Sequence, residues 1–238
     1  MRVGVTLPTF HDDPGRVLRL AREAEGSGID GVFLFDHLWH IGKKGKPALH
    51  GPTLMGAIVA ATSRIWIGSL VARIGIQQPA VLAAMFGTLD RMAPGRIIAG
   101  LGVGDGMNRE ENEAFGLPFE PRPRRINELL ETARQLRAGG LSVWIGGTTA
   151  AMWQVAAISA DAVNLWNTPV AMTREAVTHV SPAEVTWAGL PRGEVADMGL
   201  AAHLAAQAEA GAAWSIYAAG GDPTFITRLA HARREVGL

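Results

Sequence analysis

Eight short apolar segments alternate with helical segments along almost the whole chain. Most of the short segments are continuously apolar, which is typical of parallel strands with both faces buried. Eight strand-then-helix units predict an α/β fold, a closed TIM-like (β/α)8 barrel, because right-handed crossovers place every helix outside the strands. An open, doubly wound sheet is the alternative. The predicted strands are Val3–Leu7, Gly31–Phe35, Ile65–Val71, Ile97–Leu101, Ser142–Ile145, Ala162–Trp166, Glu184–Trp187 and Trp214–Tyr217.

Length and composition fit one globular domain. A chain of 238 residues is long enough for one such barrel, and we predict a single domain over residues 1–238. The hydrophobic content of 48% supports a large core, and the formal net charge of zero argues against a nucleic-acid partner. One local basic run, made of Lys43, Lys44 and Lys46, is either a solvated loop or a lid that faces an anion.

The chain contains no cysteine, which excludes a disulfide framework and is compatible with the cytoplasm. Its first residues have the pattern of a strand and lack the apolar stretch of a signal peptide. No apolar run approaches the ~20 residues that a membrane helix requires. We therefore expect a cytoplasmic protein without a membrane segment.

Proline and capping residues mark the expected helix boundaries. A capping side chain followed by proline predicts helix starts at Asp13-Pro14, Gln78-Pro79 and Asp222-Pro223. The clearest apolar stripe has helical spacing and ends close to the strand at Ser142, so the connection there is short. Its members are Ile126, Leu129, Leu130, Ala133 and Leu136.

Residues suited to chemistry follow three of the predicted strands directly. Asp36 and His37 follow the second strand, Gly102–Asp105 the fourth and Gly146–Thr149 the fifth. The carboxyl ends of parallel strands share one rim, which is where such folds place their active sites. The arrangement predicts an enzyme with a phosphate-bearing cofactor.

The pair Asp36-His37 joins a carboxylate to an imidazole at a strand end. An imidazole can donate or accept a proton near neutral pH, so His37 is a candidate catalytic residue. The alternative is an ordinary hydrogen-bonded loop pair. His40 lies three residues further on, but no compact set of about three ligands is visible, so we predict no metal site.

The glycine-rich segment Gly100–Gly106 does not meet the G-x-G-x-x-G spacing of a dinucleotide fingerprint. Repeated glycine at a strand end instead suggests that a flat ligand approaches the backbone closely. Asp105 would then lie beside that ligand. Its alternative role is to cap a helix that begins near Asn108.

The turn Gly146-Gly147-Thr148-Thr149 leads into a predicted helix over Ala150–Ser159. Free N–H groups and the positive dipole end at a helix start favour an anion such as a phosphate. The alternative is an ordinary threonine cap. Gly220–Asp222 is a second phosphate candidate, but its carboxylate disfavours an anion.

Taken together, these segments resemble the luciferase-like monooxygenase superfamily, specifically the branch that uses the deazaflavin coenzyme F420. The resemblance runs from Met1 to about Asn167 and is strongest over Gln78–Phe119. The matching residues are Pro79, Thr88-Leu-Asp-Arg-Met-Ala-Pro-Gly-Arg96, Gly100-Leu-Gly-Val-Gly-Asp105, Asn108, Glu111 and Ala114-Phe-Gly116.

The resemblance implies a deazaflavin ring across the strand ends, with His37 beside its reactive face. Asp105 takes the position of a glutamate that donates a proton in relatives, although it is one methylene shorter. A bulge with a cis peptide is implied at Leu70-Val71. The residues expected to bind the cofactor are Asp36, Leu70, Val71, Gly104, Asn108, Gly146, Gly147, Thr148 and Thr149.

These observations favour an F420-dependent oxidoreductase that transfers a hydride to or from a small organic substrate. The alternatives are an FMN-dependent monooxygenase and a cofactor-binding barrel without turnover, the latter because relatives usually carry a longer insertion before the fifth strand. A homodimer is implied by the resemblance alone. The sequence does not specify the substrate, for which the candidate pocket residues are His11, Trp39, Arg73, Trp166 and Trp187.

Overall fold

The computed structural model describes residues 1–40, 42–43, 46–218 and 220–238. Within these residues, nine parallel strands form one sheet. The strands are β1 (Arg2–Thr6), β2 (Gly31–Leu34), β3 (Trp66–Ser69), β4 (Ala72–Arg73), β5 (Ile97–Gly102), β6 (Ser142–Gly146), β7 (Ala162–Trp166), β8 (Glu184–Gly189) and β9 (Trp214–Ala218). The helices are α1 (Pro14–Gly26), α2 (Gly51–Ala61), α3 (Pro79–Met92), α4 (Asn108–Ala114), α5 (Arg122–Ala138), α6 (Ala150–Ser159), α7 (Val170–His179), α8 (Glu194–Met198), α9 (Leu200–Glu209) and α10 (Phe225–Glu235).

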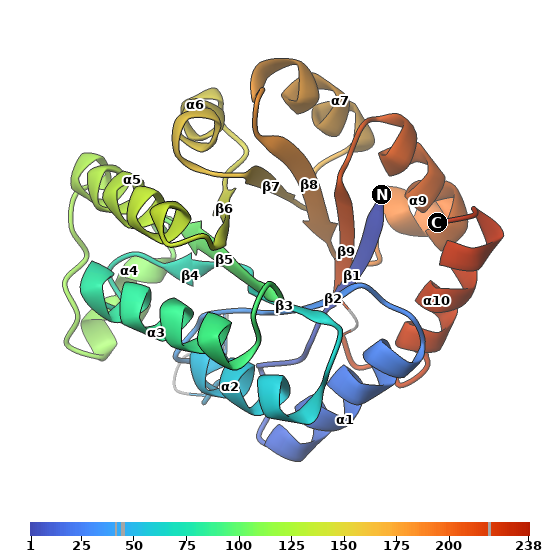
Figure 1. The fold of residues 1–238 in the computed structure, drawn as a ribbon, viewed down its shortest axis with the longest axis horizontal. Helices are drawn as coiled ribbons and strands as arrows, with labels where there is room; N and C mark the ends of the chain where they lie inside the picture. The colour runs from blue at the N-terminus through green and yellow to red at the C-terminus, as the bar shows by residue number, and fades with distance from the viewer. Residues whose placement is uncertain (41, 44–45, 219) are drawn as a thin grey trace.

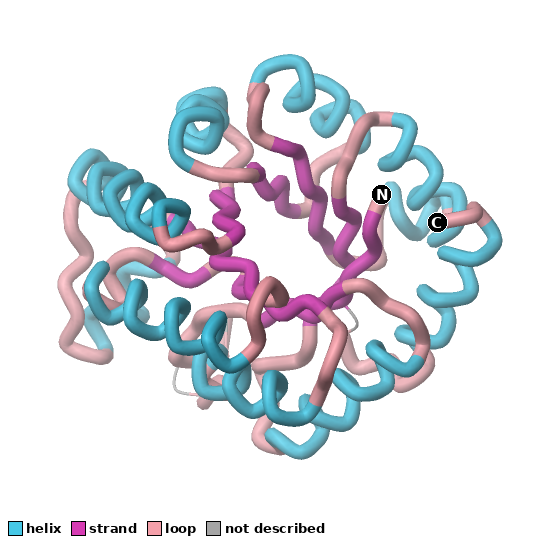
Figure 2. Tube along the Cα trace, viewed as in Figure 1, coloured by secondary structure: helices cyan, strands magenta, loops and turns pink. Residues whose placement is uncertain are grey.

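The sheet closes on itself (Figure 1). Its strand order is β3-β2-β1-β9-β8-β7-β6-β5-β4, and β3 also pairs with β5, where Ile67 lies opposite Ile97. Figure 2 shows the strands as an inner ring with the helices around it. The predicted (β/α)8 barrel is therefore confirmed. That residues 1–238 form a single domain stays a prediction.

The third predicted strand, Ile65–Val71, is not continuous. Gly68 lies opposite Ile98 and Ala72 lies opposite Leu101, so β3 and β4 contain one residue more than the facing part of β5. An extra residue on one strand is a β-bulge, and it separates β3 from β4. The Leu70-Val71 peptide within the bulge is cis, as the family resemblance implied.

Aromatic side chains fill the interior of the barrel. Phe33, Trp144 and Trp214 pack there with ring centres 5.4–5.6 Å apart. The guanidinium of Arg2 lies 5.5 Å from the ring centre of Trp66 and 5.6 Å from that of Trp214. Several of the tryptophans thus have a packing role rather than a ligand-binding one.

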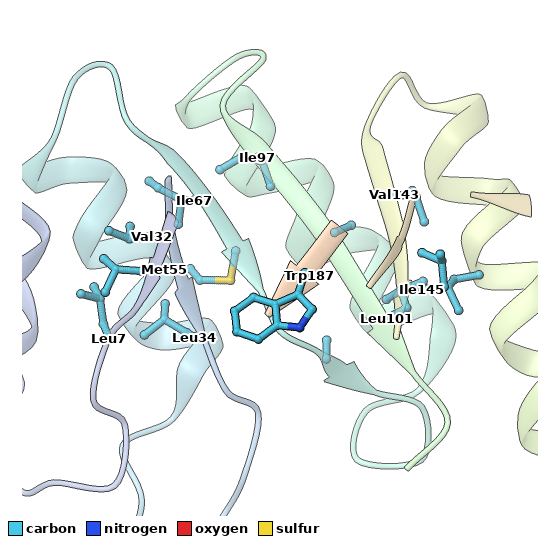
Figure 3. Close-up of a cluster of buried hydrophobic side chains, with 14 of the residues drawn as sticks. Leu7, Val32, Leu34, Met55, Ile67, Ile97, Leu101, Val143, Ile145 and Trp187 are labelled. Carbon is cyan, nitrogen blue, oxygen red and sulfur yellow. The ribbon is translucent and has the colours of Figure 1, made fainter. Parts of the chain in front are cut away.

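A second apolar layer lies between the strands and the helices. Figure 3 shows part of it, including Val32, Leu34, Met55 and Trp187. Trp187 was a candidate pocket residue, but it is only 2% exposed and its ring lies 4.6 Å from that of His203 on α9. It therefore belongs to the outer layer rather than to the barrel interior.

The helix boundaries agree with most of the predicted starts. α1 and α3 begin at Pro14 and Pro79, although the Asp13 carboxylate binds Arg19 at 2.9 Å instead of capping α1. α10 begins at Phe225 instead of Pro223, because the carboxylate of Asp222 accepts hydrogen bonds from the backbone N–H and the hydroxyl of Thr224 and closes a turn ahead of the helix.

The apolar stripe predicted for α5 is confirmed, since Leu129, Ala133 and Leu136 are buried and Ile126 and Leu130 pack at its edges. Only residues 139–141 connect α5 to β6, which confirms the short connection before that strand.

Lys43 and Lys46 of the predicted basic run are exposed, and Lys44 lies outside the described residues. No helix within the described residues is long and apolar enough to cross a membrane.

Candidate active site

The carboxylate of Glu111 joins the end of β2 to the end of β4. Its Oε2 lies 3.1 Å from His37 Nδ1 and accepts a hydrogen bond of 2.6 Å from Arg73 Nη2. Its Oε1 accepts hydrogen bonds from the backbone N–H groups of Leu38 at 2.5 Å and Trp39 at 3.2 Å. We call these residues, Glu111, His37, Arg73, Leu38 and Trp39, the Glu111 cluster.

The Glu111 cluster is a buried ion pair with an imidazole attached. Glu111 is 1% exposed and Arg73 is 5% exposed. Burial raises the pKa of Glu111, but the hydrogen bond with His37 and the charge of Arg73 outweigh burial, so the pKa is lowered overall. Burial lowers the pKa of the Arg73 guanidinium, which stays protonated because an arginine does not lose its proton in proteins. The pair is therefore ionised near neutral pH.

His37, the predicted catalytic residue, lies at the rim. Its side chain is 15% exposed, and its Nε2 has no hydrogen-bond partner within the described part of the chain. The ring lies 5.7 Å from that of Phe10. One nitrogen is thus held by Glu111, and the other has no partner among the described residues.

Asp36 occupies a different environment from its neighbour. It is 2% exposed, and it lines a small interior space together with Met55 of α2, Ala72 of β4 and Met85 of α3. Its Oδ2 accepts a 3.0 Å hydrogen bond from the backbone N–H of Arg73, while its Oδ1 is buried with no partner among the described residues. Burial raises the pKa of Asp36. Through this hydrogen bond the Asp36 side chain links β4 to the end of β2.

The glycines of β5 accommodate the bulge. A Cβ atom at Gly100 would lie 2.1 Å from the carbonyl oxygen of Ser69, and one at Gly102 would lie 2.3 Å from Val71 Cγ2. At Gly146 a Cβ atom would lie 3.1 Å from Val71 Cγ1. Gly100 and Gly102 therefore have a structural reason to be glycine, and the close approach of a flat ligand to this backbone stays a prediction.

Asp105 and Asn108 close the turn that precedes α4. The side-chain oxygen of Asn108 accepts a hydrogen bond of 2.8 Å from the backbone N–H of Asp105, and Asp105 Oδ1 accepts one of 2.9 Å from that of Met107. Gly104 has a φ of 66°, which favours glycine. Asp105 is exposed, so its carboxylate stabilises the turn and is accessible from solvent.

The turn before α6 has structural partners of its own. A Cβ atom at Gly147 would lie 2.4 Å from Met152 Cβ, so glycine is required for the helix to pack there. Thr149 Oγ1 accepts a hydrogen bond of 3.4 Å from the N–H of Met152, which is the ordinary threonine cap. Thr148 is exposed. Binding of a phosphate at Gly146, Gly147, Thr148 and Thr149 stays a prediction.

Partly exposed aromatic side chains lie at the same rim. Phe35 stacks on Phe10 at 5.8 Å and meets Trp166 edge-on at 5.4 Å. Trp166 is 38% exposed, and Val71 is only partly buried. Such a surface suits the face of a flat, largely apolar ring.

A cavity of about 470 Å³ lies outside the barrel wall, between the loops that follow β7 and β8. It is lined by Asn167, Thr168, Pro169, Trp187, Arg192, Gly193, Glu194, Val195, Asp197 and His203. This cavity contains none of the Glu111 cluster, so Trp187 faces a different space from the one expected.

No group of three or more His, Asp or Glu side chains among the described residues is arranged to hold a metal ion. His40 packs against Phe10 with ring centres 4.8 Å apart. Sequence reasoning missed the central place of Glu111, which it recorded only as one matching position of the family pattern. The residue stands among Glu110 and Glu113, and nothing local distinguishes it from them.

Several F420-dependent enzymes are similar to this chain in sequence. It is 33% identical over 132 residues to an F420-dependent glucose-6-phosphate dehydrogenase of Microbacterium testaceum, a match that covers 55% of the chain and 38% of that protein. For the enzyme of the same name from Intrasporangium calvum the identity is 37% over 145 residues, covering 57% and 42%. The chain thus spans about two fifths of the length of the curated relatives it matches.

Solved structures share the fold at lower sequence identity. An F420-dependent secondary alcohol dehydrogenase in complex with an F420-acetone adduct superposes with a TM-score of 0.81 at 16% identity, covering 99% of this chain and 98% of that one. The coenzyme F420 dependent tetrahydromethanopterin reductase of Methanopyrus kandleri gives 0.75 at 14% identity, with coverage of 99% and 98%.

The family model of the luciferase-like monooxygenases matches residues 1–142, which is more than half of the chain. That segment contains the bulge, His37 and the whole Glu111 cluster. The chain belongs to the luciferase-like monooxygenase family.

Proposed function

We propose that this protein is an F420-dependent oxidoreductase that transfers a hydride between the deazaflavin ring and a small organic substrate. The observation that carries the proposal is the placement of His37 at the barrel rim. Its Nδ1 is held by the buried Glu111–Arg73 pair, and its Nε2 has no hydrogen-bond partner among the described residues. The similarity to proteins named F420-dependent glucose-6-phosphate dehydrogenase supports the choice of cofactor.

The residues at the rim fit such a cofactor. The partly exposed surfaces of Phe35, Trp166 and Val71 suit a flat ring, and the start of α6 at Thr149 suits a phosphate. When bound, F420 supplies the hydride donor or acceptor.

The protein's own residues bind the reactants, orient them and handle protons. His37 holds or moves a proton at Nε2, beside the ligand. Asp105, exposed on the neighbouring turn, is the second proton carrier in the proposal. Asp36 accepts a hydrogen bond from the backbone N–H of Arg73, and contact of Asp36 with the ring is a further prediction. The other proposed cofactor contacts are Leu70, Val71, Gly104, Asn108, Gly146, Gly147, Thr148 and Thr149.

The proposal is tested by titrating the purified protein with F420 and, separately, with FMN, and then measuring reduction or oxidation of bound F420 by a panel of alcohols, sugar phosphates, ketones and enoates. We expect saturable F420 binding and turnover with at least one substrate class. Replacing His37 with alanine is expected to lower turnover about 10²-fold or more, with F420 binding retained.

A matched control is His231→Ala on the outer helix α10, where the imidazole is exposed and pairs with Glu235 at 3.2 Å. This variant is expected to behave like the parent. A clear preference for FMN would contradict the cofactor assignment. Unchanged turnover in His37→Ala would remove His37 from the mechanism, and bound F420 that no substrate reduces or oxidises would favour a barrel without turnover.

A homodimer is part of the proposal because the family resemblance implies one, and light scattering coupled to size-exclusion chromatography measures it. A cytoplasmic location is supported by the absence of cysteine.

A further inference from the structure

Apart from His37, the described groups that bind the carboxylate of Glu111 can only donate hydrogen bonds. Its Oε1 accepts from the backbone N–H groups of Leu38 and Trp39, and its Oε2 accepts from the guanidinium of Arg73. Neither a backbone N–H group nor a guanidinium can act as an acceptor. The carboxylate is therefore held in its ionised, acceptor-only form, and this is also the form that it presents to His37.

An ionised carboxylate 3.1 Å from an imidazole nitrogen requires a proton on that nitrogen. A neutral imidazole carries one proton, so its other nitrogen is then a bare acceptor. For His37 the nitrogen that faces Glu111 is Nδ1, and the nitrogen left over is Nε2, which has no partner in the described part of the chain.

We propose that Glu111 is the positioning residue of His37, keeping the proton of the neutral imidazole on Nδ1 and thereby leaving Nε2 as a proton acceptor at the rim. Only the identity of the ligand that gives up this proton rests on the proposed function. When Nε2 takes the proton, His37 becomes an imidazolium with both nitrogens protonated. Returning the proton to a ligand or to water restores the Nδ1–H form, so no other reactant is needed.

Glu111 also positions the imidazole through the backbone. The same carboxylate binds the N–H groups of the two residues that follow His37, so the turn and the ring are held from one point. Arg73 binds the oxygen that faces the imidazole, at 2.6 Å, and this lowers the basicity of that oxygen. The imidazole therefore keeps its proton at Nδ1 and donates it to Glu111 in a hydrogen bond.

The tautomer of His37 can be measured in the protein without any cofactor. Histidine labelled with ¹⁵N at both ring nitrogens distinguishes the Nδ1–H from the Nε2–H form by NMR, and the signals of His37 are assigned from their loss in His37→Gln. At a pH where His37 is neutral we expect the Nδ1–H form in about tenfold or greater excess, because hydrogen bonds to charged groups are the strong ones.

Replacing Glu111 with glutamine changes the hydrogen-bond pattern without changing the size of the side chain. With its oxygen retained by Leu38 and Trp39, the amide N–H₂ takes the place of Oε2 and donates to His37 where the carboxylate accepted. Arg73, which can only donate, loses its acceptor at this position, and Nδ1 of His37 loses the acceptor that held its proton. The tautomer ratio is expected to fall about tenfold or to reverse. Glu113→Gln, an exposed change two residues further along α4, is the matched control and is expected to leave the ratio unchanged.

An Nε2–H form in the parent protein would overturn the proposal, and so would an unchanged ratio in Glu111→Gln. The measurement on the parent alone decides the matter if Glu111→Gln does not fold. Arg73→Lys keeps a cation on Glu111 and is expected to retain the Nδ1–H form. If the protein turns over F420, Glu111→Gln should lower kcat on the order of 10²-fold with a smaller change in KM.

The two proposals fail separately. A protein that binds no F420 but shows the Nδ1–H form would overturn the proposed function and leave the role of Glu111 intact. A protein that uses F420 but shows the Nε2–H form would do the reverse.

Discussion

Replacing Gly100 with alanine tests how the barrel accommodates its bulge. The added Cβ atom would lie 2.1 Å from the carbonyl oxygen of Ser69, whereas real Cβ atoms essentially never approach another atom within 3.0 Å. The Cβ atom and the carbonyl oxygen must separate by about 0.9 Å, and both are bonded directly to the backbone of paired strands, β3 and β5. No side chain can rotate away to relieve the contact, so the strands themselves have to move.

Overpacking a tight interior costs about 1–3 kcal/mol, and a contact with backbone on both sides falls at the upper end, so we expect Gly100→Ala to lower the free energy of unfolding by about 3 kcal/mol. For a chain of this size that corresponds to a Tm lower by about 6–12 °C. Urea unfolding followed by tryptophan fluorescence and by circular dichroism measures the change.

Gly56→Ala is the matched control, because Gly56 lies in the middle of α2 and a Cβ atom there would meet nothing within 4 Å. Alanine is the better helix former, so this variant should be as stable as the parent or more stable by up to about 1 kcal/mol. If Gly100→Ala unfolds within about 0.5 kcal/mol of the parent, the close packing of β5 against the bulge is refuted.

Three further predictions concern the buried charges. Arg73→Met leaves Glu111 buried without its cation and should lower the free energy of unfolding by about 3–5 kcal/mol, whereas Arg124→Met, at an exposed pair, should cost at most about 1 kcal/mol; urea unfolding of both variants measures this. The pKa of Glu111 is lowered in the folded protein, so its stabilising contribution is present above the unfolded value of 4.5 and is lost as the pH falls through the folded pKa. Unfolding curves below pH 4.5 should therefore show Glu111→Gln to be less sensitive to acid than the parent. The pKa of Asp36 is raised in the folded protein instead, so the free energy of unfolding falls as the pH rises above 3.8 toward the folded pKa. Asp36→Asn should therefore gain stability relative to the parent over the same range, and an equal dependence of unfolding free energy on pH in both proteins would contradict this.

The barrel could be predicted because its determinants are local. Continuous apolar runs such as Ile97–Leu101 identify strands buried on both faces, and prolines such as Pro14 and Pro79 mark helix starts. The break within Ile65–Val71 could not be predicted from these residues, which are no less apolar than a continuous strand. The bulge depends on the glycines of β5, about 30 residues further along the chain, because side chains there would collide with Ser69 and Val71.

The site could be predicted only in part for the same reason. His37 stands directly after an apolar run, and that position alone places it at the rim. Its partner Glu111 is 74 residues away in the sequence and is brought to it by α4. Asp36 and His37 are neighbours in sequence, yet the first is 2% exposed and the side chain of the second is 15% exposed, with an Nε2 that has no partner among the described residues. Such differences follow from the packing of distant elements, which residue types and spacing do not reveal.

A crystal structure of the protein with F420 tests the central claim most directly. We predict that the deazaflavin ring lies across the carboxyl ends of the strands, in contact with Val71 and with Nε2 of His37. A ring bound in the cavity between the loops after β7 and β8, away from His37, would contradict the account.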